Sequence, residues 1–229
     1  MNESSLVVKS NHLIEASYKL SLNEQRLILM AISQLRNRRP MGSQKIQQVT
    51  ALDYQEMFGL SQKNAYRELK AATDNLFQRD IKTYDDKGMD RFRWVERVRY
   101  EKKEGFVELH FTDSIAPYLT KIYKNFTQYE LKKLSNVKST YAIRLFEMFK
   151  RWEQKGERFI TMADYRKWFE LENKYKLYSD LRKRVIEPAI TELEEKANLT
   201  ISWDEKKKGR KVVGFDFMFE ENQQTDMFK

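Results

Sequence analysis

Apolar residues at helical spacing, followed by stretches that alternate between apolar and polar residues, occur in the same order in both halves of the chain. In the first half, Ser21 with Glu24 three residues later has the pattern of a helix capping box, and Gly59 stands where a helix commonly ends. The pattern predicts helices at residues 21–35, 50–59 and 61–77, a short strand at 46–49, and further strands at 81–84, 91–102 and 106–111.

The second half repeats this plan and closes with a strong hairpin pattern. It predicts helices at 139–154, 164–171 and 179–197, a strand at 158–160, and a final pair of strands at 199–205 and 212–219. Pro188 lies inside the last helix and should kink it or break its hydrogen-bond ladder. Residues 112–137 join the halves, and their many aromatic side chains predict a packed, helical connection, whereas residues 220–229 have the pattern of a frayed tail.

An eight-residue motif relates the halves directly. Asp53-Tyr54-Gln55-Glu56-Met57-Phe58-Gly59-Leu60 returns 111 residues later as Asp164-Tyr165-Arg166-Lys167-Trp168-Phe169-Glu170-Leu171. The apolar helix before each motif contains an Arg-Leu pair, and an amphipathic segment and a strand-like run follow each. One unit of three helices and a hairpin is therefore repeated, which predicts two domains, 1–125 and 126–229.

A helix–turn–helix followed by a β-hairpin is the plan of a winged helix, in which the third helix reads DNA and the hairpin forms the wing. We therefore predict an α+β protein of two tandem winged-helix domains related by internal duplication. The formal net charge of +9, with 34% of residues charged, favours a polyanionic partner. In a chain this basic, the expected use of the repeated unit is to bind double-stranded DNA.

The third helix of the first unit, residues 61–77, has an apolar side and an opposite polar side. We expect DNA contacts from the polar side, at Lys63, Asn64, Arg67 and Lys70. Arginine and lysine can bind guanine, asparagine can bind adenine, and all of them can bind phosphate. For any single helix the alternative is an ordinary solvated face, but the third position of a helix–turn–helix favours DNA.

In the matching helix of the second unit, Lys183 and Arg184 point away from the apolar stripe, and Arg182 lies nearer to it. A recognition helix enters the groove with its N-terminal end, so we expect these three residues to contact DNA. The hairpin tip adds five positive charges, which should follow the phosphate backbone and supply affinity rather than base preference; they belong to Lys206, Lys207, Lys208, Arg210 and Lys211.

Several classes of protein lack support in the sequence. There is no phosphate-binding G-x-x-x-x-G-K-[ST] loop of an ATPase or helicase. His12 and His110 are the only histidines and lie far apart, so a metal-dependent nicking site is not favoured, and we expect no catalytic residue, metal or cofactor. The chain has no cysteine, no export signal and no apolar run of 18 residues, which favours the cytoplasm and no membrane contact.

Several separated blocks resemble the plasmid replication initiators of the iteron-binding Rep family (the Rep_3 type). They are Ser21-Leu22-Asn23-Glu24-Gln25-Arg26-Leu27-Ile28-Leu29-Met30-Ala31, Phe126-Thr127-Gln128-Tyr129, Ser139-Thr140-Tyr141-Ala142-Ile143-Arg144-Leu145-Phe146-Glu147 and Lys207-Lys208-Gly209-Arg210 with Val213-Gly214-Phe215. This resemblance implies two winged-helix domains that bind directly repeated origin sites as a monomer, open the origin, and recruit the host initiator and helicase. It also implies repression of the protein's own promoter by a dimer.

Two other points stay open at the level of the sequence. A dimeric transcriptional repressor without a replication role would use the same DNA-binding residues but an inverted-repeat operator. Exposed-looking alternation at Arg93, Glu96 and Arg99 predicts an uncovered sheet edge, through which the first unit could pair with a second copy. The alternative is that this β region packs on the aromatic connection.

Overall fold

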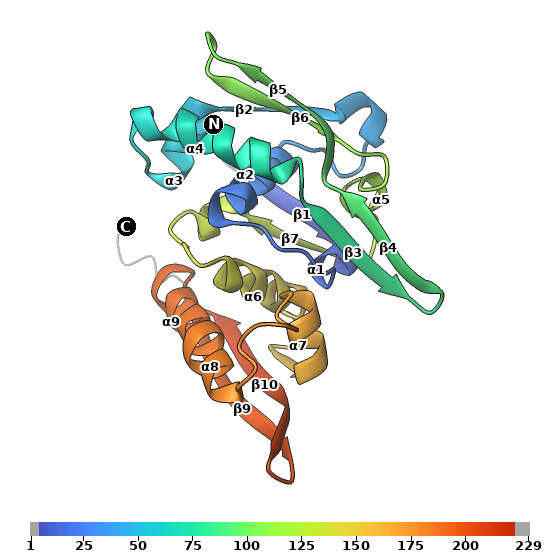
Figure 1. Ribbon diagram of the computed structural model, residues 1–229, viewed down its shortest axis with the longest axis vertical. Coiled ribbons are helices and arrows are strands. Elements are labelled where there is room, and N and C mark those ends of the chain that lie inside the picture. Colours follow the sequence, from blue (N-terminus) through green and yellow to red (C-terminus); the bar gives the residue numbers. More distant parts are fainter. Residues whose placement is uncertain (1–4, 223–229) are drawn as a thin grey trace, which may run out of the picture.

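The computed structural model describes residues 5–222, except for the side chains of Gln62 and Lys63. Figure 1 shows two units, one above the other, with strands β1 and β7 between them. The buried apolar side chains of both units form one continuous cluster, so the units pack directly on each other. None of the helices within residues 5–222 combines the length and the apolar character needed to cross a membrane.

The first unit follows the predicted order of helices and strands, with additions. Its elements are β1 (Leu6–Ser10), α1 (Asn11–Ile14), α2 (Leu22–Ser33), a 3-10 turn (Met41–Gln44), β2 (Ile46–Thr50), α3 (Ala51–Phe58), α4 (Gln62–Leu76), β3 (Asp80–Asp85), β4 (Gly88–Arg93), β5 (Val95–Glu101), β6 (Phe106–Phe111) and α5 (Ala116–Leu119). The capping box predicted at the start of α2 is confirmed, because Ser21 and Glu24 bond to each other's backbone amides.

The second unit repeats this plan after the connection. Its elements are β7 (Phe126–Glu130), a 3-10 turn (Leu131–Leu134), α6 (Thr140–Arg151), β8 (Glu157–Thr161), α7 (Met162–Trp168), α8 (Tyr178–Leu181), the π-helical turn η3 (Arg182–Ile186), α9 (Glu187–Lys196), β9 (Leu199–Lys208) and β10 (Lys211–Glu221). Strand β10 includes two residues expected in a frayed tail, and residues 223–229 of that tail lie outside the described residues.

The duplication extends to individual hydrogen bonds at the start of the motif helices. The Thr50 hydroxyl caps α3 by accepting from the Asp53 amide at 3.0 Å and donates to the Asp53 carboxylate at 2.7 Å. Thr161 and Asp164 make the same two bonds at the start of α7, with the same distances. In each unit, the bond that the threonine hydroxyl accepts satisfies a backbone amide that the first helical turn leaves without a partner.

The same helices also end alike. Tyr54 and Tyr165 are fully buried at equivalent positions. Gly59 follows α3 with a left-handed backbone, φ 63°, and Glu170 follows α7 with φ 49°. The two units therefore turn at the same residue, although only the first unit has the glycine that this conformation favours.

The sheets identify the wing of each unit. Strands β2, β6 and β5 form an antiparallel sheet in that order, and β8, β10 and β9 form the same sheet in the second unit. The hairpin β5–β6 is thus the first wing and β9–β10 the second. The expectation of one strand at 91–102 is wrong, because fully buried Trp94 divides it into β4 and β5, which belong to different sheets.

The expectation of a helical connection is also wrong in part. The connection is packed, but β7 pairs antiparallel with the N-terminal strand β1, from Leu6 opposite Glu130 to Ser10 opposite Phe126. Thr127 and Tyr129 are buried and their neighbours exposed, which is the two-residue period of a half-buried strand. The expected domain boundary at 125/126 falls immediately before this strand.

A buried ion pair lies where β1, β7 and the second unit meet. The Lys9 ammonium is 2.6 Å from the Glu147 carboxylate of α6, and both side chains are at most 1% exposed. The Tyr129 hydroxyl donates to the same carboxylate at 2.6 Å. Burial, with the adjacent carboxylate, raises the pKa of Tyr129 well above its usual value.

One arginine of each unit reaches the segment that leads into the other unit. Arg26 of α2 donates to the carbonyls of Ser135 and Val137, at 3.4 and 3.5 Å, just before α6. Arg144 of α6 donates to the Ala16 carbonyl at 2.7 Å, before α2. These bonds and the buried ion pair join the two units.

Pro188 changes the helix that contains it. The predicted helix at 179–197 is divided into α8, the π-helical turn η3 and α9, with Pro188 in the first turn of α9. The Glu187 amide donates to the Arg182 carbonyl, five residues back. Proline has no amide hydrogen and its ring collides with the carbonyl four residues back, so the wider turn accommodates it.

Candidate nucleic-acid interface

The third helix of the first unit, α4, has the predicted two-sided character. Ala65, Leu69 and Leu76 are fully buried on one side, whereas Arg67 and Lys70 are exposed and Asn64 is half-buried. Lys63 lies on this helix, but its side chain lies outside the described residues.

Of the candidate residues on α4, Lys70 also joins the helix to its wing. Its ammonium is 3.0 Å from the Asp74 carboxylate and 4.9 Å from the centre of the Tyr100 ring on β5. The Tyr100 hydroxyl donates to Asp74, and this hydrogen bond is the main cause that lowers the pKa of Asp74. Arg67 donates to Asn64 at 2.9 Å, which places the two side chains together on the exposed face.

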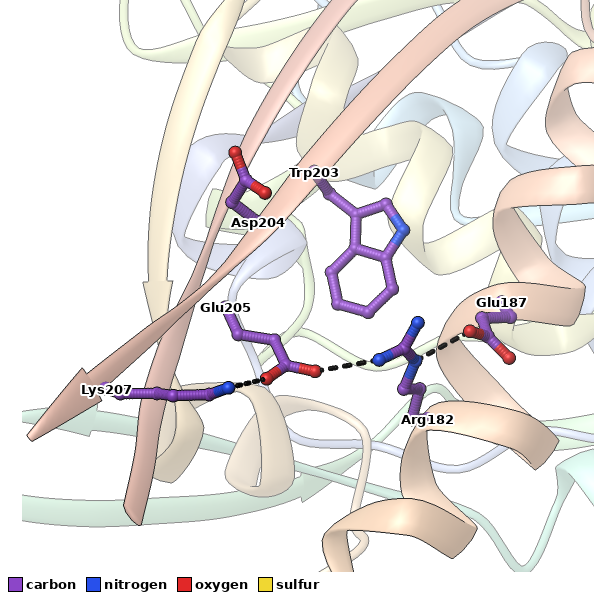
Figure 2. A pocket seen from close by; sticks show the side chains of 6 residues that line it. All are labelled: Arg182, Glu187, Trp203, Asp204, Glu205 and Lys207. Atoms are coloured by element: carbon purple, nitrogen blue, oxygen red, sulfur yellow. Dashed lines mark hydrogen bonds and ion pairs between the residues drawn. The ribbon is translucent and has the colours of Figure 1, made fainter. Parts of the chain in front are cut away.

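In the second unit Arg182 lies between the recognition helix and the wing, as Lys70 does in the first unit. Figure 2 shows its guanidinium between two carboxylates, Glu187 at 2.6 Å and Glu205 on β9 at 3.0 Å. The Trp203 ring of β9 lies 5.5 Å from the guanidinium carbon. The hydrogen bond to Glu187 raises the pKa of Arg182, and Tyr178 of α8 donates to Glu205 at 2.6 Å. These contacts hold the recognition helix to the wing.

Lys183 and Arg184 are the basic residues of η3 that face away from the core. Both are exposed, and the Arg184 side chain remains 70% accessible although it lies 3.7 Å from Asp180. Their neighbours Val185 and Ile186 are buried. The helix therefore presents these two side chains outward at its N-terminal end, as the sequence predicts.

The wing tip of the second unit carries the predicted basic cluster. Strands β9 and β10 extend beyond the predicted bounds to Lys208 and Lys211, which leaves Gly209, with φ 61°, and Arg210 in the turn. All five basic side chains of the tip are exposed. Lys206 pairs with Asp216 at 2.6 Å and Lys207 with Glu205 at 2.9 Å.

The turn of the first wing carries exposed basic residues that the sequence pattern did not predict as DNA contacts. Lys102 and Lys103 are exposed at the turn of the first wing, next to Gly105, whose φ is 69°. This turn occupies the place of the Lys206–Lys208 tip in the second unit. In both hairpins two adjacent lysines come shortly before a glycine. This pattern could have identified the turn of the first wing, had the strand break at Trp94 been recognised.

The loop before the second recognition helix is also basic and is held firmly. Lys174 and Lys176 are exposed on it. The Arg166 guanidinium donates to the carbonyls of Leu171, Lys174 and Tyr175, at 3.0, 2.9 and 2.7 Å. One side chain of α7 thereby fixes the path of the chain into α8.

The candidate residues form two groups rather than one. One group lies on α4 and the other on η3 and the second wing, and Figure 1 shows these helices in different units on the same side of the molecule. Both groups have exposed cationic side chains suited to phosphates and base edges, and Asn64 adds a half-buried amide to the first group. Within residues 5–222, histidine and acidic side chains form no group of three that could hold a metal ion.

Two family models match the chain, "Initiator Replication protein, WH1" over residues 6–150 and "Initiator Rep protein, WH2" over residues 161–219. A "Replication initiation protein" of Escherichia coli is 27% identical over 97% of this chain and 72% of its own, and the "PI protein" of Escherichia coli is 22% identical over 97% and 86%. A crystal structure of Pi initiator protein in complex with iteron DNA has a TM-score of 0.83, with 21% identity, over 98% of this chain and all of that one. Because the first model alone covers more than half of the residues, the chain belongs to the family of plasmid initiator replication proteins.

Proposed function

We propose that this protein initiates plasmid replication by binding directly repeated origin sites, the iterons, with both of its winged-helix units. The observation that carries the proposal is the presence of two recognition helices, α4 and η3–α9, each with an exposed basic face and a basic wing, in one chain. A solved relative of the same fold is described in complex with iteron DNA. Two such helices on one chain suit a site with two major-groove contacts.

The contacts divide into two kinds by their position. Arg67, Asn64, Lys183 and Arg184 lie on the outer faces of the recognition helices, where side chains can reach base edges. The wing cluster at 206–211, and the first wing's turn, would follow the phosphate backbone. Because Arg182 is bound on both sides by carboxylates, we assign it a supporting role in the second unit.

The further steps belong to the same proposal. The protein itself would catalyse no reaction; it would open the origin by binding and recruit the host initiator and helicase. The 1–125 unit would contact DNA and mediate dimerisation, and the 126–229 unit would supply the main DNA contact. Acting in the cytoplasm, a dimer would also repress the protein's own promoter.

The sheet of the first unit supports dimerisation. Strand β5 lies at the edge of its sheet, and Glu96 and Arg99 are exposed on it, as predicted. Strand β4, in contrast, packs on the connection, where Phe92 stacks on Tyr118 at 5.4 Å between ring centres. Strand β4 thus packs on the aromatic connection, which was the expected alternative. Strand β5 is the sheet edge that remains for pairing with a second copy. Light scattering over a concentration series, with iteron and promoter DNA, should show two masses; a single mass on both DNAs would refute the dimer.

A complementation experiment tests the proposal as a whole. A small origin fragment that lacks the gene is transformed into cells in which this protein is supplied from a second replicon. We expect the fragment to be maintained only when the protein is present. If the protein binds the origin repeats and represses its promoter but never maintains the fragment, it is a transcriptional repressor instead. If metal-dependent cleavage of an origin oligonucleotide occurs, a nicking enzyme replaces both.

A further inference from the structure

The hairpin β3–β4 has no counterpart in the second unit. In the first unit it stands between the recognition helix and the wing, and it forms a two-stranded sheet of its own. In the second unit α9 is followed within three residues by the wing strand β9. Figure 1 shows the β3–β4 hairpin reaching out from the first unit above α7 of the second. Its contacts with the second unit therefore contribute to how the two units are held together.

Two direct contacts, and a third path through Ser17, join this hairpin to the end of α7. Ser17 and Lys82 exchange two backbone hydrogen bonds of 2.9 Å, which attaches the hairpin to the segment before α2. The Ser17 hydroxyl donates to the Lys167 carbonyl at 2.7 Å, and the Lys82 ammonium pairs with the Glu170 carboxylate at 2.8 Å. The Lys167 ammonium lies 3.3 Å from the centre of the Tyr84 ring.

Glu170 has a side chain although its backbone conformation is one that favours glycine. Its φ of 49° is a conformation that disfavours residues with a β-carbon, and the first unit has Gly59 at the equivalent position. A glycine would relieve this strain at Glu170. The contact that a glycine would lose is the ion pair with Lys82, which joins the two units.

The Glu170 carboxylate interacts with more cations than its ion-pair partner Lys82 alone. The charge of Glu170 acts on Lys82, Lys19 and Arg79 of the first unit, and Lys174 of the second unit lies beside Lys19. The neighbouring ammonium of Lys174 lowers the pKa of Lys19, whereas Glu170 acts in the opposite direction. Glu170 raises the pKa of Lys82. Without its carboxylate, cations of the two units would face each other across the seam.

Glu170 also begins the segment that leads into the second recognition helix, and Arg166 holds that segment. We propose that the β3–β4 hairpin is a brace that fixes the rotation of the second recognition helix relative to the first, with Lys82 and Glu170 as its positioning residues. The brace makes the protein accept one spacing between the two half-sites of a repeat. This inference rests on the proposed function, in which both units bind one DNA site.

The spacing of the half-sites provides the test. Binding of the full chain is measured on origin repeats with zero, one or two base pairs added or removed between the half-sites; each base pair turns one half-site by about 34–36° relative to the other. Wild type should have a sharp optimum, with at least about a tenfold loss at one base pair from it.

The Lys82→Glu variant places two carboxylates together. It should lose about fivefold to tenfold at the native spacing and retain less than about a threefold difference between spacings, because a partly buried ion pair becomes a repulsion. Binding to DNA with only one half-site should stay within about twofold of wild type, as both recognition helices are intact. The double variant Lys82→Glu with Glu170→Lys should restore the optimum, and Lys87→Glu on the same hairpin should leave it unchanged.

A second measurement needs no DNA. Because the chain has no cysteine, Glu56→Cys and Glu195→Cys, both on exposed helix faces, can carry spin labels on α3 and α9. Glu170→Gly should broaden the distance distribution between the labels while its melting temperature stays equal or rises, since strain is relieved. A purely structural role for Glu170 would instead lower the melting temperature and leave the distribution unchanged.

The outcomes separate this inference from the function on which it rests. If Lys82→Glu keeps the wild-type optimum and Glu170→Gly the wild-type distance distribution, the brace is refuted. Equal losses by Lys82→Glu on all DNAs, half-sites included, would also refute it. If wild type shows no preferred spacing, tandem binding fails, and the label distances still decide whether the hairpin holds the two units.

Discussion

Replacing Arg166 should uncouple the second recognition helix from its own domain. The guanidinium donates to three carbonyls of the loop before α8, those of Leu171, Lys174 and Tyr175, at distances from 2.7 to 3.0 Å. Two of the three bonds are partly buried and one is exposed. A hydrogen bond from a charged donor contributes about 1.5–3 kcal/mol, less where water competes, so loss of all three should cost the loop about 2–4 kcal/mol.

Amide hydrogen exchange reports this cost locally. The Leu171 amide bonds to the Arg166 carbonyl at 2.8 Å, and the Lys174 amide bonds to the Leu171 carbonyl at 3.1 Å. In Arg166→Met, which keeps the aliphatic part of the side chain, their protection should fall by at least about 30-fold, since about 1.4 kcal/mol corresponds to a factor of ten. Protection in the core of the first unit should not change.

Affinity for DNA should depend on the order of this loop. Because a displaced α8 must be reordered before it binds, affinity for the second half-site should fall by about tenfold or more in Arg166→Met. Gln55 occupies the equivalent position in the first unit, so Gln55→Ala is the matched control and should change both measurements by less than about twofold. Unchanged loop protection and unchanged half-site affinity in Arg166→Met would refute the assigned role.

Three further predictions concern affinity, base preference and stability. If about 6–10 phosphates are neutralised, affinity for duplex DNA should fall roughly 10³–10⁵-fold between about 50 and 200 mM salt, and alanine at Lys207 and Lys208 should make this slope shallower on every sequence; a flat salt profile would contradict the basic interface. Arg67→Ala and Arg184→Ala should each relax base preference by about 1–3 kcal/mol, at positions about one helical turn apart, as measured by selection from randomised sites; relaxation at the same base pairs would exclude tandem docking. Glu147→Ala leaves a buried ammonium without its partner and should lower the free energy of unfolding by about 3–5 kcal/mol in urea titrations, and a loss below about 1 kcal/mol would show that the pair is not buried in solution.

Hydrophobic periodicity and capping residues were sufficient to predict most of the helices and the second wing. Thr50 and Ser21 start helices as predicted, because these local patterns act within a few residues of the chain. The break at Trp94 was missed because alternation continues through it, and the choice of partner strand depends on distant residues. Strand β7 was missed for the same reason, since its partner β1 lies more than a hundred residues away.

The candidate interface was predictable in part. The exposure of Arg67, Lys183 and Arg184 follows from helical geometry and agrees with the structure, while their contact with DNA stays a prediction. The bonds of Arg182 to carboxylates on either side could not be predicted, because one of them comes from the wing strand. The π-helical turn before Pro188 shifts the side chains around it, and hydrophobic periodicity does not specify such a turn.

We propose that one chain presents two recognition helices to one origin repeat. Hydroxyl-radical footprinting and sedimentation, performed together on DNA with a single repeat, test this most directly. We predict one protein per repeat and two protected regions about one helical turn apart, of which Arg67→Ala weakens one and Arg184→Ala the other. A single protected region, or binding only as two copies on an inverted site, would contradict the claim.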